Sequence, residues 1–142
     1  MKTVRQLLDE KGHEILSISP DSMVFDALKV MAAHRVGALV VMEGDRLAGI
    51  FSERDYAREV VLKGKTSKTT PVAEIMSQKV IIVSPDNTVE DCMNLMSGKR
   101  IRHLPVVEND KVIGVLSIGD LVKETIAYQQ FLIQQLESYI RS

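Results

Sequence analysis

The chain has 142 residues, of which 45% are hydrophobic, 26% charged and 4% aromatic, which predicts one ordinary domain or two small ones around a real core. Eighteen basic and nineteen acidic residues give a formal net charge of −1, so we expect no nucleic-acid partner, because general binders carry a basic field. One cysteine, three histidines and no long apolar run exclude a disulfide framework, a structural zinc site and a membrane span. We therefore expect a soluble cytoplasmic protein, or one of an organellar matrix if the source is eukaryotic.

The first elements along the chain are a short helix and a strand. Thr3 and Gln6 have the spacing of a capping box, which predicts a helix that ends near Gly12. The mostly aliphatic run at 15–18 precedes Ser-Pro-Asp, a pattern typical of a buried strand followed by a turn.

A helix, two strands and a second helix follow. Apolar residues at three- and four-residue spacings predict the helix, with Asp21 or Ser22 as its N-cap. Residues 39–42 and 47–51 flank a tight turn and predict paired strands. A second helix begins at Ser52, so this part of the chain reads β-α-β-β-α.

The remaining elements repeat this order after a polar linker at 63–69. Thr70 as N-cap and Pro71 as the first helical residue predict a short helix over 71–76. The following elements are a strand at 80–83, a helix capped by Asp86 or Asn87, paired strands at 104–107 and 112–116, and a helix from Ser117.

The repetition is an internal duplication. An offset of 65 aligns residues 15–59 with residues 80–124 without a gap, and 15 of the 45 aligned pairs are identical. Two copies argue for a pseudo-symmetric pair rather than an open solenoid, which usually needs three or more repeats. We expect a first unit at 1–66 with its N-terminal helix, a second unit at 67–126, and a C-terminal helical extension at 127–142.

The duplicated unit resembles a known family. It carries Gly-x-x-Ser-x-x-Asp at 49–55 and again at 114–120, Ser-Pro-Asp before each first helix, and Pro-Val-Ala-Glu-Ile-Met at 71–76. These features resemble the tandem cystathionine-β-synthase (CBS) domain pair, or Bateman module, of the small stand-alone type. The resemblance implies an α/β (α+β) fold of two β-α-β-β-α units, packed through their sheets with pseudo-twofold symmetry around two clefts for adenine nucleotides.

The repeated serine and aspartate suit such a ligand. Asp55 and Asp120 lie one turn into a helix and can accept hydrogen bonds from a ribose diol. Ser52 and Ser117 lie at helix N-termini, where unpaired N–H groups and the helix dipole favour a phosphate. The alternative reading is that both aspartates only favour the first turn of a helix.

The resemblance also implies that each cleft borrows residues from the opposite copy. Arg102 and His103 would supply phosphate donors to the first cleft, whereas the matching positions in the second, Gly37 and Ala38, carry no cation. His34 or Arg35 could reach into the second cleft, or its small residues could admit a larger ligand. The first cleft would comprise Ile50, Ser52, Arg54, Asp55, Val80, Ile81, Ile82, Arg102 and His103, and the second Leu16, Ser17, Gly37, Ala38, Val115, Ser117 and Asp120.

Several residues have simpler interpretations. Arg102 can be a solvated strand edge, and His103 can be a half-buried histidine. Arg35 and Arg100 match across the copies but can equally cap the preceding helix. Cys92 aligns with an alanine, which favours a small core residue over a reactive thiol.

We interpret the chain as a stand-alone regulatory sensor and not as an enzyme. Its expected ligand is AMP, ADP or ATP, with NAD as a further option, and no metal is required. We expect a homodimer, a protein target regulated in trans, and no membrane partner. The apolar residues Phe131, Leu132, Leu136 and Tyr139 should pack on a partner chain or on the module's own flank. The alternative is a non-catalytic dimerisation or scaffold protein with vestigial clefts.

Overall fold

The computed structural model describes residues 1–141, and they form two compact units. Unit 1 contains residues 1–13, 82–108 and 113 onward, and unit 2 contains residues 14–81 with the short segment 109–112. These spatial units cut across the sequence copies. The N-terminal segment groups with the second copy, and the segment just before Ile82 groups with the first.

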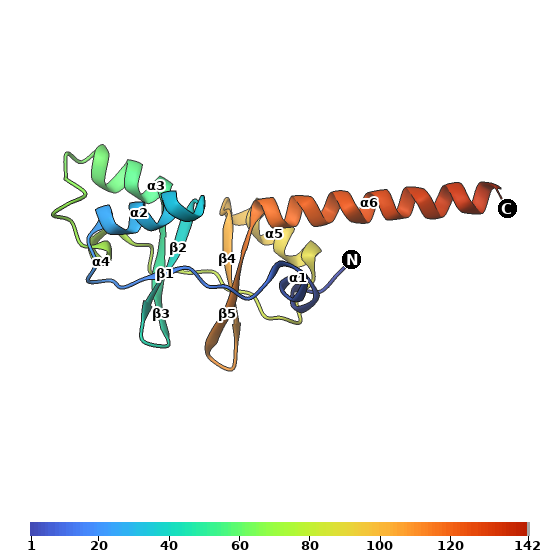
Figure 1. The fold of residues 1–142 in the computed structure, drawn as a ribbon, viewed down its shortest axis with the longest axis horizontal. Coiled ribbons are helices and arrows are strands. Elements are labelled where there is room, and N and C mark those ends of the chain that lie inside the picture. Colours follow the sequence, from blue (N-terminus) through green and yellow to red (C-terminus); the bar gives the residue numbers. More distant parts are fainter. Residues whose placement is uncertain (142) are drawn as a thin grey trace. The chain divides into compact units, whose positions relative to one another are not determined.

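Unit 2 contains a three-stranded sheet with strand order β1-β2-β3. Strand β1 runs parallel to β2, and β2 runs antiparallel to β3. The π-helix η1 follows the short helix α3 directly. In chain order its elements (Figure 1) are β1 (Ser17–Ile18), α2 (Val24–His34), β2 (Ala38–Glu43), β3 (Arg46–Ser52), α3 (Glu53–Asp55), η1 (Tyr56–Val61) and α4 (Val72–Ile75).

Unit 1 contains the two-stranded sheet β4-β5 and three helices. The mixed α+β class implied by the family resemblance is confirmed. Its elements are α1 (Val4–Lys11), α5 (Val89–Lys99), β4 (His103–Glu108), β5 (Lys111–Ser117) and α6 (Ile118–Arg141).

The strand expected at 80–83 is reduced to one parallel bridge between Val83 and Val106. In the first copy Val40 pairs with Ser17 in the corresponding parallel ladder. The matching residue in the second copy is Pro105, whose carbonyl accepts from the Val83 N–H at 3.0 Å. Proline has no N–H to donate to the next rung, so the ladder ends there.

The helix α5 begins with a complete capping box. The Thr88 side chain accepts from the Asp91 N–H, and the Asp91 carboxylate accepts from the Thr88 N–H. The prediction of Asp86 or Asn87 as the N-cap was therefore wrong. The side chain of Asn87 instead accepts from the N–H of Ser84 in the preceding turn.

The helix α2 has no side-chain cap, because its N-cap is Met23 and not Asp21 or Ser22. Backbone carbonyls in and just after the linker take that role: Thr70 O accepts from the first helical N–H and Ser67 O from the second, each at 2.9 Å. Helix α4 starts at Val72, one residue later than predicted, with Pro71 as its N-cap.

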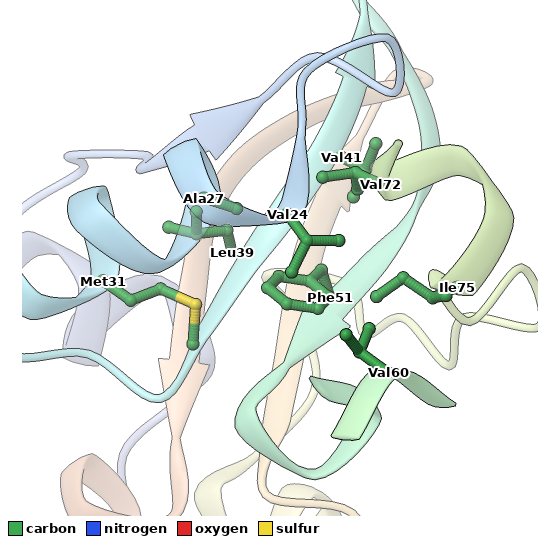
Figure 2. Close-up of a cluster of buried hydrophobic side chains, with 9 residues drawn as sticks. All are labelled: Val24, Ala27, Met31, Leu39, Val41, Phe51, Val60, Val72 and Ile75. Carbon is green, nitrogen blue, oxygen red and sulfur yellow. The ribbon is translucent and has the colours of Figure 1, made fainter. Parts of the chain in front are cut away.

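The core of unit 2 lies between its sheet and its helices (Figure 2). Phe51, at the end of β3, is fully buried in its centre. Cys92 is buried in unit 1, and burial, followed by the charge of Asp91, raises the pKa of its thiol to about 11, as expected for an inert core residue. The unit 2 cluster consists of Val24, Ala27, Met31, Leu39, Val41, Phe51, Val60, Val72 and Ile75.

The last helix, α6, packs on its own unit only along its first turns. There α5 lies beside it, while the rest of the helix extends away from that contact (Figure 1). From Gln129 to Arg141 every residue is exposed. The expectation that its apolar residues pack on the module's own flank is therefore wrong for the described chain, and packing on a partner chain stays a prediction.

Candidate functional site

Ser52 and Asp55 form a capping box that fixes the start of α3. The Ser52 hydroxyl accepts from the Asp55 N–H at 3.2 Å, and Asp55 Oδ2 accepts from the Ser52 N–H at 2.9 Å. The other carboxylate oxygen, Oδ1, accepts from the hydroxyl of Ser77 at 3.3 Å. The carboxylate therefore already has a structural role, which supports the simpler reading of Asp55 but does not use every acceptor position of a carboxylate.

Ser117 and Asp120 repeat this arrangement at the start of α6. Asp120 Oδ2 accepts from the Ser117 N–H at 2.8 Å, and the Asp120 N–H donates to the Ser117 hydroxyl at 3.2 Å. The difference lies in the second donor. It is the ammonium of Lys11, at the end of α1, which is 2.5 Å from the same Asp120 oxygen.

The two sites use matching acceptors but different donors. In unit 2, Ser77 donates its N–H to the Ile50 carbonyl at 2.9 Å as well as its hydroxyl to Asp55. In unit 1 the corresponding carbonyl belongs to Val115, and Lys11 donates to it and to Asp120. A charged ammonium thus stands in one site where a neutral serine stands in the other.

The electrostatics of Asp120 reflect this neighbour. Burial alone would raise the pKa of Asp120, but the hydrogen bond and charge of Lys11 and the Ser117 N–H together hold it below its usual range. The sequence suggests His34 or Arg35 as a cation for the second site, and the structure adds Lys11, which contacts Asp120. Neither Lys11 nor Ser77 is among the predicted site residues, because Lys11 is predicted to belong to the first unit and Ser77 to the second.

Helices α1 and α4 are equivalent elements, and each groups with the sequence copy in the other half of the chain, α1 with the second copy and α4 with the first. Thr3 pairs with Thr88 and Pro71 with Met23 in equivalent antiparallel bridges, so α1 and α4 correspond with an offset of 68 rather than 65. Helix α1 has eight residues against four in α4. The longer helix is what brings Lys11 to β5 and α6.

The motif glycines allow these helices to approach their strands. A Cβ added to Gly49 would lie 2.7 Å from the Ser77 carbonyl oxygen, and one added to Gly114 would lie 2.6 Å from a methyl group of Leu8. Both distances are shorter than real Cβ contacts allow. The glycine of Gly-x-x-Ser-x-x-Asp therefore sets the spacing between the strand and the segment that carries Ser77 or Lys11.

The other predicted site residues are divided between the units. The backbone of Gly37 lies beside Ser52, because its carbonyl accepts from the Glu53 N–H at 3.0 Å, and Ala38 pairs with Ser52 in the sheet. The Arg102 carbonyl similarly accepts from the Ile118 N–H at 2.8 Å. Within each unit the structure thus places Gly37 and Ala38 at the Ser52 site and Arg102 at the Ser117 site. The predicted sharing of residues across copies stays a prediction. Unit 2 holds Leu16, Ser17, Ile50, Arg54, Val80 and Ile81, and unit 1 holds Ile82, His103 and Val115.

Arg35 and Arg100 end the first helix of each copy, as one of the two alternatives predicted. Both adopt left-handed backbone conformations, with φ of 55° and 54°, and their N–H groups donate to Met31 and Met96. Among residues 1–141, no group of three or more His, Cys, Asp or Glu side chains is arranged to hold a metal ion. No helix in that range is long and apolar enough to cross a membrane.

Comparison with known proteins identifies similar chains. A family model for the CBS domain matches residues 4–62 and 72–126. The mitochondrial CBS domain-containing protein CBSX3 of Arabidopsis thaliana is 40% identical over 148 residues, which cover 98% of this chain and 72% of that protein. The solved CBS domain structure NE2398 is 53% identical, has a TM-score of 0.85, and the match covers 88% of this chain and 98% of that one. The CBS domain pair of MJ0100, solved with 5′-methylthioadenosine and S-adenosyl-L-methionine, shares the fold, with a TM-score of 0.80 at 22% identity over 90% of this chain and 98% of that one.

Proposed function

This chain belongs to the CBS domain family, and we propose that it is a stand-alone, non-catalytic sensor of adenine nucleotides. The observation that carries the proposal is the repeated Ser-x-x-Asp capping box, at Ser52–Asp55 and Ser117–Asp120. Each box presents a fixed carboxylate for a ribose diol beside a helix N-terminus that favours phosphate. AMP, ADP or ATP fits this chemistry, and NAD shares the adenosine part.

A further fact supports an adenosine ligand. The MJ0100 pair, which shares the fold, was solved with two adenosine-containing compounds. The two sites of this chain differ in their donors, since one has Ser77 and the other Lys11. Ligand binding would favour one conformation or assembly of the module. A protein target in the cytoplasm or an organellar matrix would recognise that state. The ligand can shift that equilibrium only by its difference in affinity for the two states.

A thermal-shift panel tests the proposal. The purified protein is melted with increasing AMP, ADP, ATP, NAD and S-adenosylmethionine, because a ligand that binds only the folded state raises the melting temperature with concentration. We expect at least one adenine nucleotide to do so and guanosine monophosphate to do less. If none of these compounds moves the transition while the protein is a stable dimer, the scaffold alternative is correct.

Substitution of Asp55 assigns the effect to a site. Asp55→Ala should weaken nucleotide binding there by ~1.5–3 kcal/mol, about 10- to 150-fold, because it removes an ionised acceptor. Calorimetry measures this loss. Asp91→Ala is the matched control, since it also removes the acidic residue of a capping box, in α5, away from the predicted ligand. Equal affinities in the two variants would remove Asp55 from the site.

We further propose that the chain forms a homodimer through α6. Val122, Ile126, Ile133, Leu136 and Ile140 recur at the spacing of coiled-coil core positions and are 42% to 80% exposed. An isolated helix as short as the exposed stretch from Gln129 to Arg141 is marginal in water, so we expect packing to stabilise this half of α6. Self-association has a precedent in the CBS-CP12 protein of bloom-forming cyanobacteria, a hexamer that shares the fold at 28% identity.

The charges on α6 favour a second copy in the antiparallel direction. Lys123 and Glu137 each follow directly after a core position, Val122 and Leu136 respectively. In an antiparallel pair of helices, such a flanking position lies opposite the equivalent flanking position of the partner helix. Lys123 of one copy therefore lies opposite Glu137 of the other. The low basic content of the helix argues against an anionic membrane as the occupant.

A further inference from the structure

Lys11 holds two acceptors that the Asp120 site would offer to a nucleoside. Its ammonium lies 2.5 Å from Asp120 Oδ2 and 2.5 Å from the Val115 carbonyl oxygen. Both partners are on other elements of unit 1, β5 and α6, so the contact joins the end of α1 to the site. Its partner carboxylate is largely covered, with 23% of the Asp120 side chain exposed.

The other site shows what Lys11 replaces. There the Ile50 carbonyl and Asp55 Oδ1 accept from Ser77, a neutral residue whose hydroxyl is 3.3 Å from the carboxylate. When the Ser77 hydroxyl moves away, Asp55 loses one neutral hydrogen-bond donor. When the Lys11 ammonium moves away, Asp120 loses a charge-assisted hydrogen bond and an ion pair. The same acceptors are therefore harder to free at Asp120 than at Asp55.

Resting on the proposed function, we infer that Lys11 is a specificity-determining residue that makes the Asp120 site select phosphorylated ligands over neutral nucleosides. A nucleoside without phosphate must take Asp120 from the ammonium and leaves that ammonium without an anionic partner. A nucleotide offers its phosphate to the displaced ammonium, so the charge pairing lost at Asp120 is regained on the ligand. The long lysine side chain, which is 35% exposed in its present position, can make this exchange without movement of α1.

The test compares AMP with adenosine at this site alone. In an Asp55→Ala background, which weakens the other site, calorimetry measures both affinities with Lys11 intact and with Lys11→Met, which keeps the length but removes the charge. We expect Lys11→Met to bind adenosine about three- to tenfold more tightly and AMP no more tightly, so that the preference for AMP falls by about three- to tenfold or more. Lys63→Met is the matched control, because it removes an ammonium from an ion pair with Glu59 in unit 2.

The outcomes separate the two proposals. An unchanged ratio of AMP to adenosine affinity in Lys11→Met, with both ligands bound, overturns the role of Lys11 and leaves the sensor function standing. Binding of neither ligand to the Asp55→Ala protein, with or without Lys11, also overturns it. Absence of binding even to the protein with both aspartates intact overturns the sensor function itself. The unfolding transition of each variant, measured without ligand, confirms that the protein compared is folded.

Discussion

At the scale of single residues, the two motif glycines differ in what surrounds them. The space beside Gly49 is closed by a backbone atom, the Ser77 carbonyl oxygen, and by the sulfur of Met76 at 2.9 Å. The space beside Gly114 is closed by the end of the Leu8 side chain. A side-chain methyl group can rotate away, but a backbone carbonyl held in a bridge to β3 cannot.

We therefore expect Gly49→Ala to destabilise the protein by ~1–3 kcal/mol, the usual cost of overpacking, and Gly114→Ala to cost less. Urea denaturation of the two variants measures the difference. Gly98→Ala, in the open on α5, is the control and should be neutral or stabilising, since alanine has the higher helix propensity. A larger loss for Gly114→Ala would show that Leu8 is held more rigidly than Ser77.

His13 makes the stability of the contact between α1 and β5 depend on pH. One ring nitrogen contacts the Asp9 carboxylate at 3.0 Å, and the other donates to the Ile113 carbonyl at 3.1 Å. The hydrogen bond to Asp9, then that to Ile113, raises the pKa of His13, while the charge of Arg5 opposes the shift. Both contacts use N–H donors only when the ring is protonated.

The stabilisation from His13 should therefore be present at acid pH and vanish at alkaline pH. A pKa raised on folding stabilises the protein fully below the unfolded value of about 6.5, and the benefit is lost as pH rises through the folded value. We expect wild type to exceed His13→Gln in denaturation midpoint at pH 5, with a smaller difference at pH 8.5. A difference that does not change between these two pH values would contradict the role of the imidazolium.

At the scale of elements, the sequence predicts what local patterns control. The capping box at Thr3 and Gln6, the two hairpins and the helices that start after Ser52 and Ser117 are all found, because spacing alone determines them. The same logic fails at Met23, where the cap comes from the carbonyls of Thr70 and Ser67, far along the chain.

Long-range pairing explains the other differences. Pro105 could be read in the sequence, but its effect on the strand at 80–83 depends on which residue faces it in the ladder. The Ser-x-x-Asp ends of the candidate site follow from the repeat, whereas Lys11 and Ser77 do not, because α1 and α4 join the sheets of the opposite sequence copies. A pattern of neighbouring residues cannot predict a contact that forms only when distant segments meet in the fold.

At the scale of the whole molecule, the exposed half of α6 is the feature that the fold itself leaves unexplained. Removal of the chain after Ala127 should leave both compact units folded, because the deleted described residues from Gln129 are exposed. It should convert the proposed dimer to a monomer. Analytical ultracentrifugation measures the mass, and an unchanged mass together with an unchanged melting temperature would show that the helix is neither an interface nor a brace.

The direction of pairing can be tested by exchanging charges. Lys123→Glu alone places two acidic residues opposite each other in an antiparallel pair, and Glu137→Lys alone places two basic ones there, so each should weaken the dimer. The double variant restores opposite charges and should recover most of the loss. The effect per pair is small, ~0.2–1 kcal/mol, but a symmetric dimer contains the pair twice. Sedimentation equilibrium at low and high salt measures it, since screening should reduce the differences. If the single exchanges leave the dimer unchanged at low salt, or the double variant is weaker than both, the helices pair in another direction or α6 docks elsewhere.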